Sequence, residues 1–91
     1  MAIGIYFKPQ GFSTERYDDV LGRLEQAGEG APAGRTHHFA WVGQDGVEVF
    51  DVWDSQESFD KFGETLIPIM NEVGADPGEP ASFEIYSMIL G

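Results

Sequence analysis

The sequence predicts an α+β fold with the element order β-α-β-β-α-β. Four short runs rich in β-branched and aromatic residues alternate with two segments whose apolar residues recur at helical spacing. Right-handed crossovers then place both helices on one face of a four-stranded antiparallel sheet, the arrangement called ferredoxin-like. We expect one domain that covers residues 1–91.

The first half of the sequence predicts one strand and one helix. Residues 2–8 are mainly apolar and aromatic, and Pro9 ends the run. A helix can begin at Ser13 or Thr14, whose side chains suit the N-cap, and Gly28 ends it. The apolar positions of this helix share one face and are Tyr17, Val20, Leu21, Leu24 and Ala27. This pattern indicates a helix that packs against the sheet.

The second half predicts a hairpin, a helix and a last strand. Two strands of about seven residues flank a turn at residues 44–46, which contains an Asp-Gly pair. The second helix begins at Asp54 or Ser55, and Gly74 ends it. Alternation of residue types over 83–90 predicts the last strand.

Composition excludes several classes of partner. Sixteen acidic residues against five basic ones give a formal charge of −11, which repels nucleic acid and anionic membranes. The chain has no cysteine, so disulfides and the usual zinc motifs are excluded. The N-terminus lacks the pattern of a signal peptide, and no apolar run has the length of a membrane span. We therefore expect an acidic cytoplasmic protein with neither metal nor cofactor.

The hairpin strands indicate a second apolar face on the sheet. Phe39 and Trp41 lie on one face of their strand, and Ala40 and Val42 lie on the other. The helices cover only one face, so another surface must cover the second. We expect a homodimer in which two sheets face each other and form an α/β barrel.

The segment VEVFDVWDSQESFDKF, residues 47–62, resembles dimeric α/β-barrel proteins related to the antibiotic-biosynthesis monooxygenases. In those proteins a strand ends in an acidic, an apolar and an aromatic residue, followed by a Ser-capped helix. The resemblance implies a homodimer with a ligand pocket between the sheet and the helices of each protomer. It also implies that Trp53 lines this pocket. Haem-degrading relatives need a histidine on the second helix, which this chain lacks.

Two adjacent histidines precede the turn, and the turn decides which of them faces the pocket. Neighbouring strand residues point to opposite faces, so the two cannot bind one metal ion. A two-residue loop at 45–46 sets His38 opposite Trp53, whereas a three-residue loop at 44–46 moves His37 to that face. We favour His38, because the residues around it match the strand of the related proteins better.

The candidate catalytic residues are His38 and Asp51. Asp51 would fix the tautomer of the imidazole, which exchanges a proton with a bound phenol or enol while Trp53 stacks on the ring. Tyr6 and Tyr86 lie in strands that we expect to be central, and each could offer a hydroxyl to the ligand. The alternative is that Trp53 is a core residue and the histidine a hydrogen-bonded strand residue.

Three functions remain open at this point. The first is a protein that binds a small apolar or aromatic molecule and acts as a cofactor-independent monooxygenase on an aromatic or polyketide-like substrate. The second is a non-catalytic dimer that serves as a binding or interaction module. The third is a decarboxylase or isomerase-type enzyme on the same fold, because the fold alone does not select a reaction.

Overall fold

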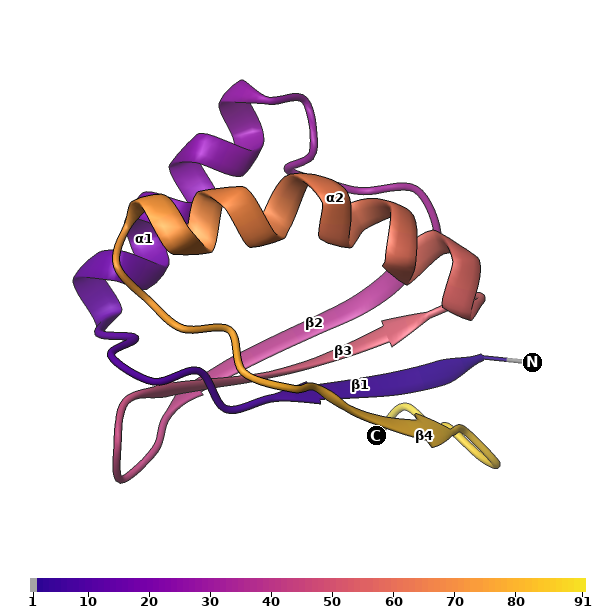
Figure 1. Cartoon of the computed structure of the whole chain (residues 1–91). Helices are drawn as coiled ribbons and strands as arrows, with labels where there is room; N and C mark the ends of the chain where they lie inside the picture. Colours follow the sequence, from indigo (N-terminus) through magenta and orange to yellow (C-terminus); the bar gives the residue numbers. More distant parts are fainter. Residues whose placement is uncertain (1) are drawn as a thin grey trace.

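The computed structural model describes residues 2–91 and has the predicted fold (Figure 1). Four antiparallel strands form one sheet in the order β2-β3-β1-β4, and both helices lie on one face of it. The elements are β1 (Ile3–Phe7), α1 (Thr14–Gln26), β2 (Arg35–Val42), β3 (Val47–Trp53), α2 (Gln56–Glu72) and β4 (Ala81–Glu84). The α+β, ferredoxin-like prediction is therefore confirmed.

Each helix begins at a serine. The Ser13 side chain accepts a hydrogen bond from the backbone N–H of Arg16 at 3.2 Å, and Ser55 accepts one from Ser58, also at 3.2 Å. These bonds satisfy N–H groups that have no partner within the helix. Of the alternatives open from the sequence, Ser13 and Ser55 are thus the N-caps.

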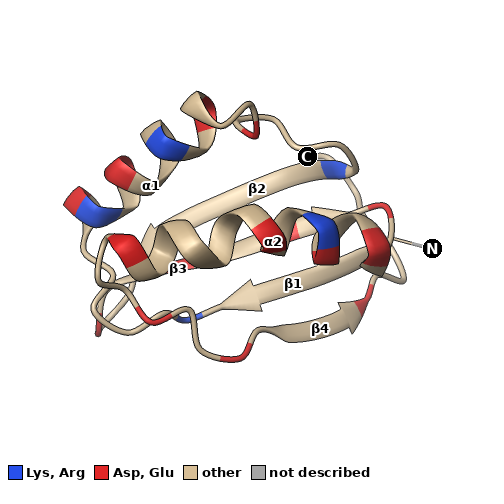
Figure 2. Cartoon of the chain, turned by 45° about the horizontal axis from the view of Figure 1, so that its top comes forward, with Lys and Arg blue, Asp and Glu red and all other residues tan. Residues whose placement is uncertain are grey.

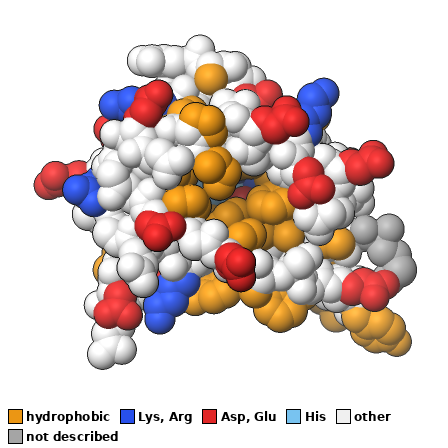
Figure 3. Space-filling view, viewed as in Figure 1, with side chains coloured by type: hydrophobic (Ala, Val, Ile, Leu, Met, Phe, Trp, Pro, Cys, Tyr) orange, Lys and Arg blue, Asp and Glu red, His pale blue; other side chains and the backbone are white. Residues whose placement is uncertain are grey.

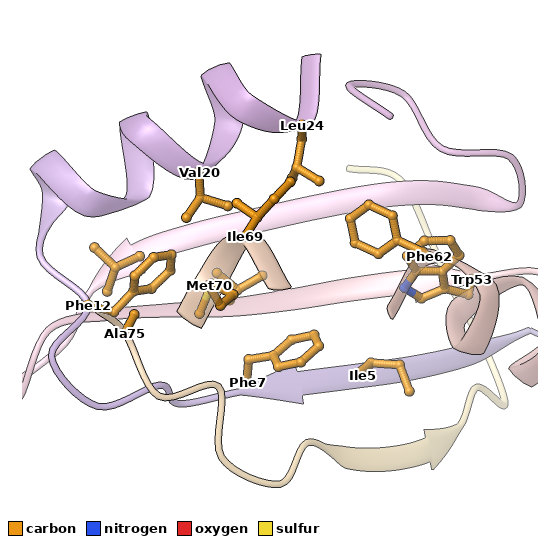
Figure 4. Close-up of a cluster of buried hydrophobic side chains, with 12 residues drawn as sticks. Ile5, Phe7, Phe12, Val20, Leu24, Trp53, Phe62, Ile69, Met70 and Ala75 are labelled. Atoms are coloured by element: carbon orange, nitrogen blue, oxygen red, sulfur yellow. The ribbon is translucent and has the colours of Figure 1, made fainter. Parts of the chain in front are cut away.

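The apolar core lies between the helices and the sheet (Figure 4). The Trp53 side chain is fully buried, and its ring contacts Phe62 of α2 at a centroid distance of 5.2 Å. Phe7 of β1 and Met70 of α2 are buried in the same cluster. The core therefore ties the end of β3 to α2.

The hairpin has a four-residue loop in place of the predicted shorter turns. Val42 pairs with Val47, so residues 43–46 form the loop, and the Gly43 N–H donates to the Gly46 carbonyl at 2.8 Å. Neither predicted turn is correct. The register differs by two residues from the two-residue turn, which keeps every side chain on its predicted face. His38 consequently lies opposite Asp51 rather than opposite Trp53.

The last strand is shorter than predicted. β4 ends at Glu84, and the Ile85 N–H adds one further bond to the Ala2 carbonyl at 3.0 Å. Residues 86–91 belong to no strand or helix, and the expected strand to residue 90 is wrong. β4 is also an edge strand, so the expectation that Tyr86 occupies a central strand is wrong as well.

The sheet face turned away from the helices, here called the outer face, is largely apolar, and several of its aromatic rings are exposed although Val52 is buried there. Phe39 and Trp41 of β2 are 53% and 43% exposed there, and Phe83 of β4 is 53% exposed. Acidic residues are spread over both helices and the loops, with few basic residues among them (Figure 2). The outer face thus contrasts with a strongly acidic helical side.

Candidate functional site

A cavity of about 50 Å³ lies between the two helices and the first three strands. Most of its lining is apolar, including Val20, Leu21, Leu24, Phe62, Leu66 and Met70 from the helices. Two larger surface hollows adjoin it. One of about 380 Å³, on the side of α2 seen in Figure 3, shares Phe7 and Leu66 with the cavity. The other, of about 550 Å³, shares Leu21, Leu24 and Arg35.

Three polar side chains from three elements form a hydrogen-bonded chain at the cavity. The Nδ1 atom of His38 in β2 lies 2.5 Å from Oδ1 of Asp51 in β3. The Nε2 atom of the same ring lies 2.6 Å from the hydroxyl of Tyr17 in α1. All three residues line the cavity. The structure thus brings together the two predicted catalytic residues and adds Tyr17.

Asp51 is the buried end of this chain. Its side chain is 3% exposed, and no other charged residue in the described part of the chain is buried. A buried carboxylate is costly unless it is hydrogen-bonded. His38 supplies that bond, and its own side chain, at 24% exposure, reaches the cavity. The pair therefore combines a fixed negative charge with an accessible imidazole.

The chain permits two protonation states. With a neutral imidazole, Nδ1–H donates to Asp51 and Nε2 accepts the Tyr17 hydroxyl proton. With an imidazolium, both nitrogens donate, and the Tyr17 oxygen accepts. In the second state the Tyr17 proton is free to point into the cavity. Protonation of His38 thus decides whether Tyr17 presents an acceptor or a donor.

The electrostatic surroundings act on the Tyr17 hydroxyl in opposing directions. Burial raises its pKa above the ordinary value of 10.0, and the negative charges of Asp51 and Asp18 raise the pKa further. The guanidinium of Arg35 lowers the same pKa. The hydroxyl therefore holds its proton at neutral pH.

A β-bulge brings Arg35 into the site. The pairing of β2 with β3 shifts between Arg35 and His37, so Arg35 pairs with Trp53 and joins the helix-facing side of the sheet. Its guanidinium lies 5.8 Å from the centre of the Phe62 ring and donates to the Gly30 carbonyl at 3.4 Å. Within residues 2–91 it forms no ion pair. A cation without a carboxylate partner thus lines the same cavity as the hydrogen-bonded chain.

The predicted ligand-binding residues do not line the cavity. The Trp53 ring packs against Phe62, which lines the cavity, and the buried indole Nε1 of Trp53 has no hydrogen-bond partner. Tyr6 is on the outer face, where its hydroxyl donates to the Glu48 carboxylate and its ring stacks on Trp41 at 6.2 Å. This hydrogen bond raises the pKa of the Tyr6 hydroxyl.

Two further residues lie elsewhere than the cavity. Tyr86 follows β4 and is 98% exposed. His37 is on the outer face, where it pairs with Val52 and stacks on Phe39 at 6.2 Å. The two adjacent histidines are therefore separated by the sheet, and only His38 lines the cavity.

Sequence reasoning missed Tyr17 and Arg35. Tyr17 was assigned to the apolar stripe of the first helix, although it is the one member of that stripe with a hydroxyl. That hydroxyl was the available signal. The position of Arg35 depends on the bulge, and no turn or glycine pattern in the sequence indicates it.

Residues 2–91 contain no group of three or more His, Asp or Glu side chains arranged to hold a metal ion. Neither of the helices in this range is long and apolar enough to cross a bilayer.

Solved structures share this fold. SnoaB, a cofactor-independent oxygenase from Streptomyces nogalater, matches with a TM-score of 0.68 and 14% identity over 97% of this chain and 96% of its own. A protein of unknown function from Nitrosomonas europaea gives 0.62 and 18% identity over 99% and 92%. A conserved protein from Methanosarcina mazei Go1 gives 0.54 and 12% identity over 90% and 88%.

The sequence comparisons are negative: no family model and no curated protein matches the chain. At these identities the structural likeness concerns the fold. The chain has the ferredoxin-like α+β fold of the oxygenase SnoaB, the fold that its resemblance to the dimeric α/β-barrel proteins implies.

Proposed function

We propose that this protein binds a small aromatic molecule in the cavity between its helices and sheet. The observation that carries the proposal is the chain of Tyr17, His38 and Asp51 at a cavity whose other walls are mostly apolar. Ligand sites typically combine apolar walls with a few convergent polar groups. The polar chain would fix an oxygen atom of the ligand while the apolar walls hold its ring.

The size of the cavity limits how a ligand is held. An apolar cavity of about 150 Å³ can bind one benzene ring, and this one measures only about 50 Å³. We therefore expect the side chains shared with the adjoining hollows to move when a ligand binds. Leu21, Leu24 and Arg35 border the hollow of about 550 Å³, which has the volume of a typical ligand site.

The reaction that we favour is a cofactor-independent oxygenation of a phenolic, polyketide-like substrate. Removal of the phenol proton by the His38 and Asp51 pair would make the ring electron-rich. Molecular oxygen would then convert a ring methylene to a carbonyl, with the second oxygen atom released as water. The fold likeness to SnoaB, described as a cofactor-independent oxygenase, supports this choice. An enolisable substrate would give a decarboxylase or isomerase reaction with the same base.

Oxygen consumption with a dihydroxyanthrone tests the oxygenase. We expect wild-type protein to consume oxygen faster than the protein-free reaction, and His38→Ala to lose this increment. His37→Ala is the matched control, because His37 lies on the outer face. Equal rates for wild type and His38→Ala would contradict the role of His38. Ligand binding without oxygen consumption would favour the alternative function, a non-catalytic binding module.

We also propose that the protein is a homodimer that buries the outer face. The exposed rings of Phe39, Trp41 and Phe83 support this, since such apolar patches mark interaction sites. Sedimentation equilibrium should give a dimer for wild type and a monomer for Trp41→Glu. Ile67→Glu places the same charge on α2, at a site of similar exposure, and should remain dimeric. A monomeric wild type would contradict the proposal.

A further inference from the structure

Both ring nitrogens of His38 are already occupied. Nδ1 lies 2.5 Å from the Asp51 carboxylate, and Nε2 lies 2.6 Å from the Tyr17 hydroxyl. A ligand in the cavity therefore finds no free nitrogen on the imidazole. The Tyr17 oxygen is the end of the chain, and an oxygen with two lone pairs and one proton can serve a further partner.

We infer that Tyr17 is the catalytic residue that meets the ligand, with His38 as the proton acceptor behind it. Asp51 would hold the imidazole and balance its positive charge. This inference rests on the proposed function and deepens it, because it names the atom that contacts the ligand and the class of ligand.

The proton transfer is balanced within the chain. The ligand O–H bond breaks, and its proton bonds to the Tyr17 oxygen. The proton that Tyr17 carried moves to Nε2 of His38 at the same time. The products are a ligand oxyanion, a neutral Tyr17 and an imidazolium that is paired with the Asp51 carboxylate. Such a relay requires donor and acceptor atoms at hydrogen-bond distance, and both contacts of His38 satisfy this requirement.

Packing holds the Tyr17 ring in place for this role. The Phe12 ring contacts it edge-on at a centroid distance of 5.8 Å, and the His38 ring lies at an interplanar angle of 8° to it. Tyr17 also lies in the first turn of α1, and its backbone N–H donates to the Ser13 carbonyl at 2.9 Å. The hydroxyl is thus oriented before a ligand arrives, which favours proton transfer.

Arg35 indicates the class of ligand. Its guanidinium lines the same cavity, and its charge acts on the Tyr17 hydroxyl. In the described part of the chain no carboxylate pairs with it. An oxyanion formed beside Tyr17 would be stabilised by this cation. The expected ligand is therefore a small apolar ring with an acidic hydroxyl, a phenol or an enol.

The test uses 4-nitrophenol, whose anion absorbs visible light, with wild type, Tyr17→Phe and the control Tyr86→Phe. At a pH below the pKa of the free probe, wild type should bind the anion, and ¹⁵N NMR should detect protonation of His38. Tyr17→Phe should weaken binding by about tenfold, the effect of one lost hydrogen bond, and leave the bound probe neutral. Tyr86→Phe removes a hydroxyl outside the cavity and should behave as wild type.

The outcomes separate this inference from the proposed function. If Tyr17→Phe bound the anion as tightly as wild type, the inference would be overturned, because His38 would then take the proton directly. The same result would still support the proposed ligand site in the cavity. No binding of the probe by wild type would contradict both. A measurement that needs no substitution is the intermolecular NOE in wild type. We expect NOEs from the probe to the Tyr17 ring, and NOEs to His38 alone would overturn the inference.

Discussion

The hydrogen bond between Asp51 and His38 should contribute a measurable coupling free energy to folding. The Oδ1 and Nδ1 atoms are 2.5 Å apart, and the Asp51 side chain is 3% exposed. A hydrogen bond to a charged group contributes about 1.5–3 kcal/mol. Little water reaches the carboxylate, so we expect the coupling to lie in this range rather than near zero, as for exposed pairs.

A double-mutant cycle measures this coupling. It compares wild type, Asp51→Ala, His38→Ala and the double variant by urea unfolding at neutral pH. Each single variant leaves one polar group without its partner, whereas the double variant removes both. The double variant should therefore be more stable than the sum of the single effects predicts. Trp53, which is fully buried, provides the fluorescence signal for unfolding.

An exposed pair at the start of β2 provides the control. Nδ1 of His37 lies 3.0 Å from Oγ1 of Thr36, and the same cycle on that pair should give about 0.5 kcal/mol or less. Each cycle is repeated at several protein concentrations, because self-association also stabilises the folded chain. A coupling between Asp51 and His38 no larger than that of the control would refute the reasoning.

Gly46→Ala should destabilise the fold by about 1–3 kcal/mol, because φ is +136° there and a Cβ would lie 2.8 Å from the Phe12 carbonyl oxygen. Gly22→Ala in α1 is the control; its Cβ would meet nothing within 4 Å, and urea unfolding should show a gain of about 0.5–1 kcal/mol. If Gly46→Ala were as stable as Gly22→Ala, this account would be contradicted. Stability should also fall as pH rises above about 10, because the raised pKa of Tyr17 lets the folded chain keep a proton that the unfolded chain releases. Tyr17→Phe should reduce that slope, and an unchanged slope would count against the buried hydroxyl.

The fold was predictable because its signals are local. The helix stripes and the two serine caps depend on neighbours within a few residues, and so do the faces of the strands. The error in the hairpin register illustrates this. The loop has four residues instead of two, but strand side chains repeat with a period of two, so His38 and Asp51 stayed on one face. The predicted faces of the side chains in β2 and β3 are therefore correct, although the predicted hairpin register is wrong.

The length of the last strand was not predictable from its own residues. Alternation continues to residue 90, but β4 has only β1 as a neighbour. Pairing stops where β1 begins, at Ile3 opposite Glu84. A strand requires a partner for its backbone groups, and the partner belongs to the other end of the chain. Residue pattern alone could not provide this limit.

The site was half predictable for a related reason. His38 and Asp51 are polar residues in largely apolar strands. Burial of such residues is costly unless they are hydrogen-bonded, so the sequence alone indicates that the two need a partner. Tyr17 fits the apolar stripe of its helix, so the sequence pattern is explained by packing alone and does not indicate a role for the hydroxyl. Arg35 reaches the site only through the bulge, which changes the face of one residue and cannot be inferred from alternation.

Stability alone gives no reason for the polar chain at the cavity. Asp51 lies between Val49 and Trp53 on the helix-facing side of β3, where an apolar residue would extend the core. Replacement of buried ionic groups by well-packed apolar residues is often neutral or stabilising. A carboxylate at this position, with an imidazole and then a tyrosine hydroxyl in line toward the cavity, is therefore better explained by the chemistry of a ligand than by folding. The guanidinium of Arg35, which has no carboxylate partner in the described part of the chain, lines the same cavity and would favour a bound anion there.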